Sequence, residues 1–148
     1  MRFDIWKLVI ICNLLLVSCI LPTYALSGND LIDKAKTYDG MTVEFVGEVV
    51  GDIMPRQEHV WLNVNDGQRA IGVWAAAKTV EKVKFAGDYT HTGDQLKIIG
   101  KFNRACSIHG GDLDIHAESI TILKAGYKVE HQFSQWKIWL ALLLGSWI

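Results

Sequence analysis

The sequence has little cysteine and little proline. Its 148 residues include three cysteines and two prolines. Cys12 and Cys19 lie in an apolar N-terminal segment, which leaves Cys106 as the one cysteine of the remaining chain. A framework of internal disulfides is therefore excluded, and Cys106 is expected to carry an unpaired thiol.

The sequence also lacks a strong excess of positive or negative charge. The chain has 15 basic and 16 acidic side chains, for a formal net charge of −1. Acidic residues still outnumber basic ones when the two apolar ends are left out. A protein that follows a nucleic-acid backbone usually presents a basic surface. The composition therefore argues against binding that depends mainly on phosphate contacts.

Catalytic signatures are also missing. The sequence contains no G-x-S-x-G, no P-loop and no G-x-G-x-x-G. Asp112 and Asp114 alternate with Leu113 and could share one face of a strand, but no other group converges on them. Solvated strand acids are the simpler interpretation. We therefore expect a binding module and not an enzyme.

Residues 1–25 resemble a secretory signal peptide. A basic start precedes the apolar run Leu8–Leu21, and small residues follow it. The run is shorter than the ~20 residues of a spanning helix. Cleavage after Ala25 would leave a mature chain that starts at Leu26, whereas a lipoprotein-type cleavage would leave a lipidated Cys19. An uncleaved anchor is the third alternative. All three predict a domain outside the cytoplasm, in the cell envelope.

Residues 136–148 form a second apolar segment, which is rich in tryptophan, a residue that favours membrane interfaces. This segment is also shorter than a spanning helix. It either lies in the interface, belongs to a spanning helix, or packs on the domain as a C-terminal helix. The run Leu140–Leu144 has no polar face, which favours the membrane as a partner. Residues 124–135 are the expected linker.

The remaining part, residues 28–123, has the pattern of an all-β domain. Val43 and Phe45 alternate with polar residues, as in a half-buried strand. Gly47, Gly51 and Gly100 interrupt two runs, and glycine inside a strand marks a bulge or a bend. The five predicted strands are Met41–Met54, His59–Asn65, Gln68–Trp74, Leu96–Asn103 and Leu113–Leu123.

Two helices complete the predicted domain. Ala76–Phe85 has helix-forming alanines and one apolar side, and it lies between the third and fourth strands. A short helix before the barrel is expected to start at Asn29 or Asp30 and to run to Tyr38. Five strands with one helix at this place are the topology of the OB fold, a barrel that binds oligonucleotides or oligosaccharides.

Asp66-Gly67 predicts a type I′ turn between the second and third strands. With those two residues as the loop, Asn65 pairs with Gln68, Leu62 with Ile71, Val60 with Val73, Trp61 with Gly72, and His59 with Trp74. The branched apolar residues then share the inner face. The outer face carries the aromatic and amide side chains of both strands, which is where OB folds bind.

Six residues are candidates for ligand binding: Trp61, Trp74, His59, Asn63, Arg69 and Lys101. Exposed tryptophans stack bases or sugar rings, each base stack contributing ~1–3 kcal/mol, and the basic residues would contact phosphates. The alternative is structural: Trp61 covers Gly72, and Trp74 is buried under the helix.

Cys106 and His109 have the spacing of a C-x-x-H metal pair in the loop between the fourth and fifth strands. His116 and His91 are further candidate ligands, and cysteine with histidine suits Zn or Cu. A metal- or heme-handling envelope protein is thus the alternative function, although His131 lacks the motif of exported OB-fold heme chaperones. The simpler interpretation is a Gly-Gly turn with a solvated His109 and a small buried Cys106.

Four segments carry a resemblance to a known group. They are Val46-Gly-Glu-Val-Val-Gly-Asp52, Trp61-Leu-Asn-Val-Asn-Asp-Gly67, Ala70-Ile-Gly-Val-Trp74 and Gly110-Gly-Asp-Leu-Asp-Ile-His-Ala-Glu118. They resemble bacterial envelope proteins with an OB fold of the nucleic-acid-binding type, related to the anticodon-binding domains of tRNA synthetases. The resemblance implies single-stranded nucleic acid as the ligand. The expected location implies a glycan or an envelope protein instead.

Overall fold

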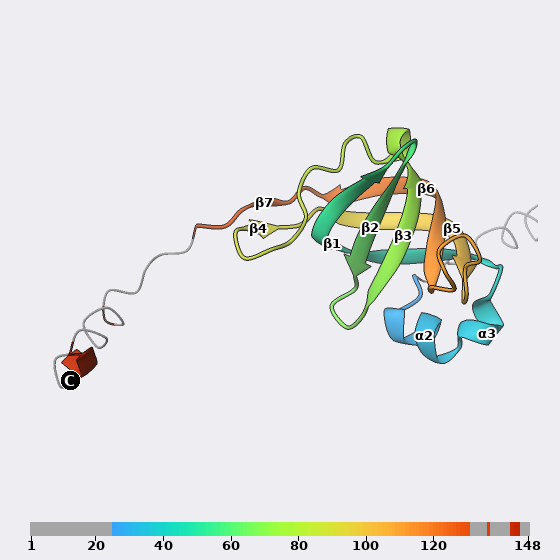
Figure 1. Ribbon diagram of the computed structural model, residues 1–148, viewed down its shortest axis with the longest axis horizontal. Helices are drawn as coiled ribbons and strands as arrows, with labels where there is room; N and C mark the ends of the chain where they lie inside the picture. The colour runs from blue at the N-terminus through green and yellow to red at the C-terminus, as the bar shows by residue number, and fades with distance from the viewer. Residues whose placement is uncertain (1–24, 131–135, 137–142, 146–148) are drawn as a thin grey trace, which may run out of the picture.

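The structure is a computed structural model that describes residues 25–130, 136 and 143–145. Five long strands form a closed barrel, with short helices at one end and a two-stranded extension (Figure 1). The barrel strands are β1 (Thr42–Arg56), β2 (His59–Asn65), β3 (Ala70–Ala76), β5 (Gln95–Asn103) and β6 (Asp114–Lys124).

The barrel has the predicted OB topology. Its strands lie in the order β1-β2-β3-β6-β5, and β1 pairs with both β2 and β5. All pairs are antiparallel except β3 with β6, which run parallel and close the barrel. Alternating side chains fill the interior, among them Phe45, Leu62 and Phe102, all fully buried. The all-β prediction is confirmed.

β1 serves two partners because it bends. Its pairing with β2 shifts register between Val50 and Met54, and Gly51 lies in this irregularity with a φ of 76°. Glycine adopts that conformation without the strain that a side chain causes. The bend expected at Gly51 is therefore present, and a second irregularity falls at Gly100 in β5.

The β2–β3 loop is longer than predicted, and the expected two-residue turn is wrong. Asn65 pairs with Ala70, so residues 66–69 form the loop. The Asp66 carboxylate accepts the backbone N–H groups of Gln68, Arg69 and Gly28. Burial alone would raise the pKa of Asp66, but these donors lower it below the ordinary value. The loop is therefore a four-residue connection stabilised by the Asp66 carboxylate, and not a two-residue type I′ turn.

The register thus differs from the prediction by two residues along β3. Leu62 pairs with Val73 and not with the predicted Ile71, and Trp61 pairs with Trp74 and not with the predicted Gly72. Side chains alternate with a period of two along a strand, so a shift of two keeps each residue on its predicted face. The outer face is therefore composed as predicted, although its pairs differ.

The N-terminal helix is interrupted and begins earlier than expected. It consists of α2 (Gly28–Asp33) and α3 (Ala35–Tyr38), separated at Lys34. Ser27 is the N-cap, because its Oγ accepts the backbone N–H of Asp30 at 3.1 Å. Leu31 of α2 is fully buried in the barrel core. The helices close one end of the barrel, as Figure 1 shows below the strands.

The helix predicted over Ala76–Phe85 is reduced to the 3-10 turn η1 (Ala77–Thr79). Val80 and Val83 are buried, as their apolar pattern indicated. The backbone that follows is held by tertiary contacts instead. The N–H groups of Lys84 and Phe85 both donate to Asp94 Oδ2, at 2.7 and 3.0 Å. A side chain ten residues away thus supplies the partner that a helix would have supplied.

A second ladder extends the barrel, made of β4 (His91–Thr92) and β7 (Tyr127–Lys128). The first part of the segment expected as a linker is therefore paired with the loop that follows η1 (Figure 1). Asp94 Oδ1 also accepts the N–H of Gly126 at 2.6 Å, which ties the end of β6 to the start of β5.

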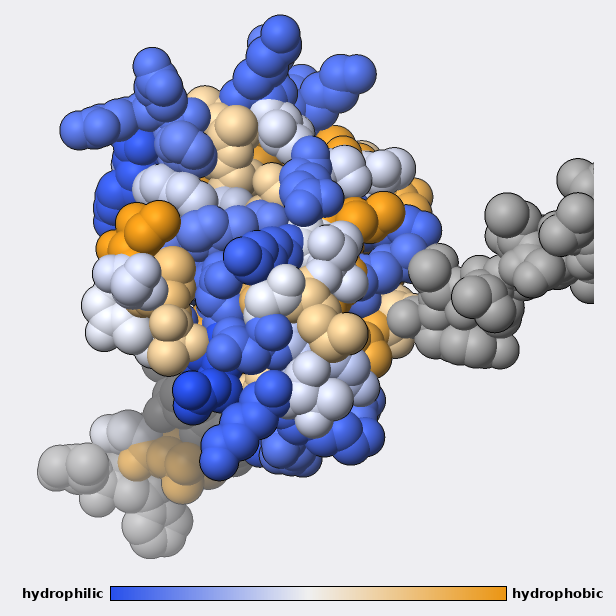
Figure 2. Space-filling view, turned by 90° about the vertical axis from the view of Figure 1, so that its right-hand side faces the viewer, coloured by the Kyte–Doolittle hydropathy of each residue, from blue (hydrophilic) through white to orange (hydrophobic). Residues whose placement is uncertain are grey.

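The apolar ends lie almost wholly outside the described residues, which include Ala25, Trp136 and residues 143–145 of them. Among the residues that the structure describes, no helix has the length and apolar character to span a membrane. The side of the domain drawn in Figure 2 is mostly hydrophilic, and its hydrophobic residues form small separate patches.

Asp94→Asn is expected to lower the free energy of unfolding by ~1–3 kcal/mol at neutral pH. Asp94 is 2% exposed, and burial alone would raise its pKa. The N–H groups of Phe85, Gly126 and Lys84 outweigh burial, so the pKa is lowered. The stabilisation is present above the unfolded pKa of ~3.9 and is lost as the pH falls through the lower folded value.

Urea unfolding of both proteins at pH 7 and pH 3 measures this effect. The difference between wild type and Asp94→Asn should shrink at the lower pH. Asp52→Asn, at an exposed position of β1, is the matched control and should stay within ~0.5 kcal/mol of wild type. A difference that is the same at both pH values would contradict the role given to the Asp94 carboxylate.

Candidate functional site

Two tryptophans lie side by side on the outer face of the β2–β3 hairpin. Trp61 and Trp74 are directly paired, with ring centroids 6.4 Å apart and planes at 55°. The His59 ring stacks on Trp74 at 4.8 Å with an interplanar angle of 8°. The indole N–H of Trp61 donates to Asn63 Oδ1 at 3.2 Å. These four predicted residues are therefore brought together on one half-buried surface, which we call the aromatic face.

Gly72 lets the aromatic face form. A Cβ built on Gly72 would lie 2.2 Å from Cζ2 of Trp61, closer than any real contact. The Trp61 ring therefore lies against the backbone at Gly72, in space that a side chain at this position would occupy. Trp61 covers Gly72, as the structural alternative required, and it also lines the hollow described next.

A hollow of about 430 Å³ opens at the aromatic face. Its lining residues are Met54, Arg56, Trp61, Trp74, His109 and Asp112. They come from the end of β1, from the β2–β3 hairpin and from the loop between β5 and β6. OB barrels bind ligands on the face of their second and third strands, beside the loops that correspond here to β1–β2 and β5–β6. The volume lies within the range of small-ligand sites.

A cluster of possible metal ligands lies beside the hollow, where the β5–β6 loop meets β6. Cys106, His109, Asp114 and His116 each offer one ligand atom, and these atoms lie within 4.8 Å of one another. We call these four residues the donor cluster. Three of them were sequence candidates, and Asp114 is new.

Asp114 is the centre of the donor cluster and is fully buried. Its Oδ2 contacts His109 Nδ1 and lies 3.3 Å from His116 Nε2, while its Oδ1 accepts the Asn103 side-chain N–H at 2.9 Å. The interpretation of Asp114 as a solvated strand acid is therefore wrong. His109, whose side chain is 13% exposed, is also not solvated, whereas Cys106 is buried as expected.

The aromatic face and the donor cluster form one continuous site. The His109 ring lies 4.6 Å from Trp74, 5.1 Å from Trp61 and 5.2 Å from His116 between centroids. The parallel pairing of β3 with β6 sets Trp74 opposite His116. Two groups of residues that are separate in the sequence thus become neighbours through the closure of the barrel.

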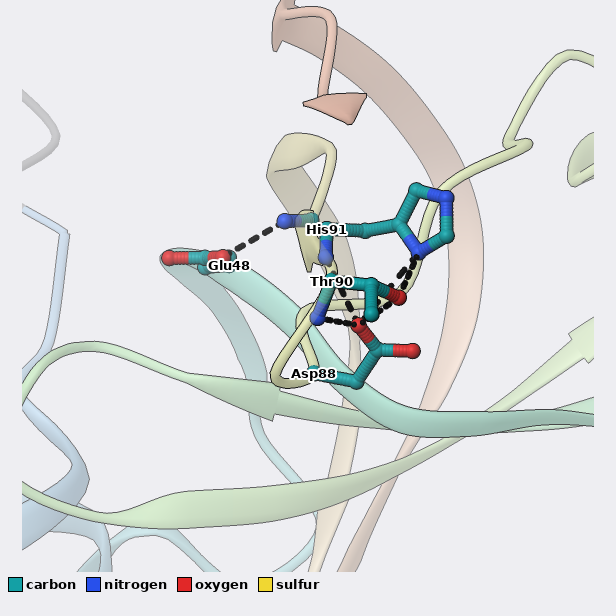
Figure 3. Close-up of polar contacts among 5 residues, drawn as sticks. Glu48, Asp88, Thr90 and His91 are labelled. Carbon is teal, nitrogen blue, oxygen red and sulfur yellow. Dashed lines mark hydrogen bonds and ion pairs between the residues drawn. The ribbon is translucent and has the colours of Figure 1, made fainter. Parts of the chain in front are cut away.

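Two predicted residues, His91 and Arg69, have other surroundings. His91 belongs to β4, where the Thr90 hydroxyl and the backbone N–H groups of Thr90 and His91 donate to Asp88 and lower its pKa (Figure 3). His91 is not part of the donor cluster. Arg69 donates to Asn29 Oδ1 at 3.0 Å, next to α2.

Lys101 lies closer to the site. It pairs with His116 across β5 and β6, so both side chains leave the barrel on the same side. Sequence reasoning missed Met54 in the hollow and Asp114 in the cluster. The spacing Asp-x-His at the start of β6 was the available signal for Asp114, because residues two apart on a strand share a face.

No family model and no curated protein matches the sequence. Solved structures do match. The asparaginyl-tRNA synthetase from Pyrococcus horikoshii, complexed with asparaginyl-adenylate, has a TM-score of 0.52 at 14% identity, over 69% of this chain and 23% of that chain. A second structure of that synthetase has a TM-score of 0.52 at 14% identity, over 70% and 24%.

The hypothetical protein YgiW from E. coli has a TM-score of 0.46 at 16% identity, over 68% of this chain and 90% of that chain. This chain spans about a quarter of the length of the synthetase that it matches. At this identity the likeness to the synthetase concerns the fold, and it confirms the OB-type barrel expected from the sequence.

Gly72→Ala is expected to displace the Trp61 ring and to lower the free energy of unfolding by ~1–3 kcal/mol through overpacking. Near-ultraviolet circular dichroism should lose part of the signal of the coupled tryptophans. The same substitution in a Trp61→Ala background should have little effect on the free energy of unfolding, because the indole ring that would clash with the methyl group of an alanine at position 72 is absent. Equal costs in both backgrounds, measured by urea unfolding as a double-mutant cycle, would show that Trp61 does not constrain position 72.

Proposed function

We propose that this protein is a binding module, without catalytic activity, that stacks planar rings of a single-stranded nucleic acid on its aromatic face. The observation that carries the proposal is that Trp61 and Trp74 together line the hollow. The hollow lies on the face that OB barrels use for ligands, beside the β1–β2 and β5–β6 loops. Stacking tolerates different bases because every base has a flat face.

The charges around the hollow support stacking as the main source of affinity. Its lining includes one basic residue, Arg56, and one acidic residue, Asp112. Lys101 pairs with His116 across β5 and β6 and is a second basic residue on the outer side of the barrel. A site with one or two phosphate contacts loses affinity only slowly as salt rises, since each contact contributes a slope of ~0.7 for single strands.

The likeness of the barrel to part of an enzyme named for tRNA supports nucleic acid as the ligand class. Because of this likeness, the proposal commits to a single-stranded nucleic acid. A glycan could stack on the same indoles and an envelope protein could cover them, so these two ligands are the alternative outcomes of the binding test.

Trp61→Ala is expected to weaken the binding of a short single-stranded oligonucleotide by ~1–3 kcal/mol, which is about 5- to 150-fold in Kd. The full-length protein in detergent is titrated with labelled oligothymidylate and oligoadenylate at two salt concentrations. The slope of log K against log salt should not exceed ~1.5 in magnitude. Unfolding curves of both proteins separate lost binding from lost stability.

Tyr127→Ala, which removes an exposed aromatic ring from β7, is the matched control and should bind as wild type does. Equal affinity of wild type and Trp61→Ala would remove the aromatic face from the proposal. Binding of an oligosaccharide but of no oligonucleotide would replace nucleic acid by a glycan.

We also propose that the domain lies outside the cytoplasm and is tethered to the membrane. The support is the sequence of the two apolar segments, Leu8–Leu21 and residues 136–148. The nucleic acid would then be extracellular or imported, and a membrane location would raise the local concentration of the module at the cell surface.

Protease added to cells with a permeabilised outer layer is expected to remove the barrel while cytoplasmic proteins remain intact. Immunoblotting against the barrel measures its loss with time. A cytoplasmic enzyme of the same cells is the internal control for lysis. Complete protection of the barrel until the cells are lysed would place it in the cytoplasm.

A further inference from the structure

We propose that the donor cluster of Cys106, His109, Asp114 and His116 is a binding site for one Zn²⁺ ion. This inference does not depend on the ring-stacking function, since the cluster is argued from its own geometry. Four side chains of three types that zinc prefers converge within 4.8 Å in the described part of the chain. Cysteine, histidine and carboxylate are each established zinc ligands.

Two distances within the donor cluster match those of a tetrahedral site, whereas His109 Nδ1 contacts Asp114 Oδ2 too closely for both atoms to bind one ion without moving. With zinc bonds of ~2.3 Å to sulfur and ~2.05 Å to nitrogen or oxygen, tetrahedral angles separate sulfur from nitrogen by ~3.6 Å and nitrogen from oxygen by ~3.3 Å. Cys106 Sγ lies 3.4 Å from His116 Nε2, and this nitrogen lies 3.3 Å from Asp114 Oδ2. All pairs of ligand atoms lie within 4.8 Å, so the widest pair would close by no more than ~1.5 Å on binding.

The contacts do not form a catalytic relay. In a Cys-His-Asp relay, the thiol and the carboxylate contact opposite nitrogens of one imidazole, so that a proton passes across the ring. Here Cys106 and Asp114 both contact Nε2 of His116. Donor atoms that meet at one point suit a shared cation better than a chain of proton transfers.

Charge supports a divalent cation. The cluster would hold a thiolate, a carboxylate and two neutral imidazoles when it binds metal, so a Zn²⁺ ion balances its charge. Asp114 is fully buried, and within the described residues its carboxylate contacts the two histidine rings but no lysine or arginine. A buried carboxylate needs such compensation.

His109 gives a second, independent observation. Its Nε2 is buried and has no hydrogen-bond partner among the described residues. Buried polar atoms of this kind are uncommon in folded proteins, and a bound ion is one of their explanations. Zinc bound to Nε2 would satisfy this atom and leave Nδ1 to contact Asp114, and it would fix the tautomer of His109, the residue that also lines the hollow.

The backbone holds the four ligands in place before metal arrives. The carbonyl oxygen of Cys106 accepts the N–H groups of His109 and Gly111 at 3.2 and 2.8 Å, which closes the loop into a compact turn. Asp114 and His116 follow on β6, two residues apart and on one face. The Asn103 side chain orients Asp114 from behind, as the supporting partners of metal ligands do.

The test is metal binding by the untagged, full-length protein in detergent, with its thiol reduced. We expect one equivalent of Zn²⁺ in competition with a chromophoric chelator, and an increase in Tm of at least ~5 °C at saturation. Co²⁺ in place of Zn²⁺ should give a thiolate charge-transfer band in the near ultraviolet. Cu²⁺ and Cu⁺ are titrated in parallel.

Cys106→Ser should abolish the charge-transfer band, and Asn103→Ala should weaken Zn²⁺ binding by ~10- to 100-fold. His91→Ala removes a histidine outside the cluster and should bind one equivalent as wild type does. Far-ultraviolet circular dichroism checks that each variant is folded. No Zn²⁺ bound, equal affinity of wild type and Cys106→Ser, or binding of copper alone would each overturn the proposal.

Discussion

The parallel pairing of β3 with β6 is the contact on which the site depends. It spans Gly72–Trp74 and Asp114–His116, and it closes the barrel between strands that are some forty residues apart in the sequence. Because parallel strands cannot be joined by a tight turn, the chain passes through η1, β4 and β5 before it returns. That detour brings the β5–β6 loop beside the tryptophans of the hairpin.

Closure has a chemical consequence at His109. This residue lines the hollow with the tryptophans and contacts Asp114 in the donor cluster. A ligand that stacks on Trp61 and Trp74 would therefore lie against an imidazole whose orientation the proposed metal ion would fix. The proposed ring-binding surface and the proposed zinc site share this side chain, so occupancy of one changes the surroundings of the other.

Two carboxylates, the buried Asp94 and the partly buried Asp66, hold the segments between the strands more than helix propensity does. Asp94 accepts three backbone N–H groups, two from the segment between η1 and β4 and one from the segment after β6. Asp66 likewise accepts three, from the β2–β3 loop and from α2. Each group satisfies backbone donors that the surrounding fold leaves without a ladder partner. This explains why the alanines that begin Ala76–Phe85 give only the 3-10 turn η1.

The sequence by itself determined the five strands, the bend at Gly51 and the faces of the hairpin, because these follow from alternation with a period of two and from glycine in strands. A register error of two residues left the outer face unchanged for the same reason. Only the tertiary structure decided that Asp114 is buried, that His91 and Arg69 lie elsewhere, and that the tryptophans meet the donor cluster. Those facts depend on the register of β3 against β6 and on how the β5–β6 loop folds against the hairpin, which alternation along single strands does not define.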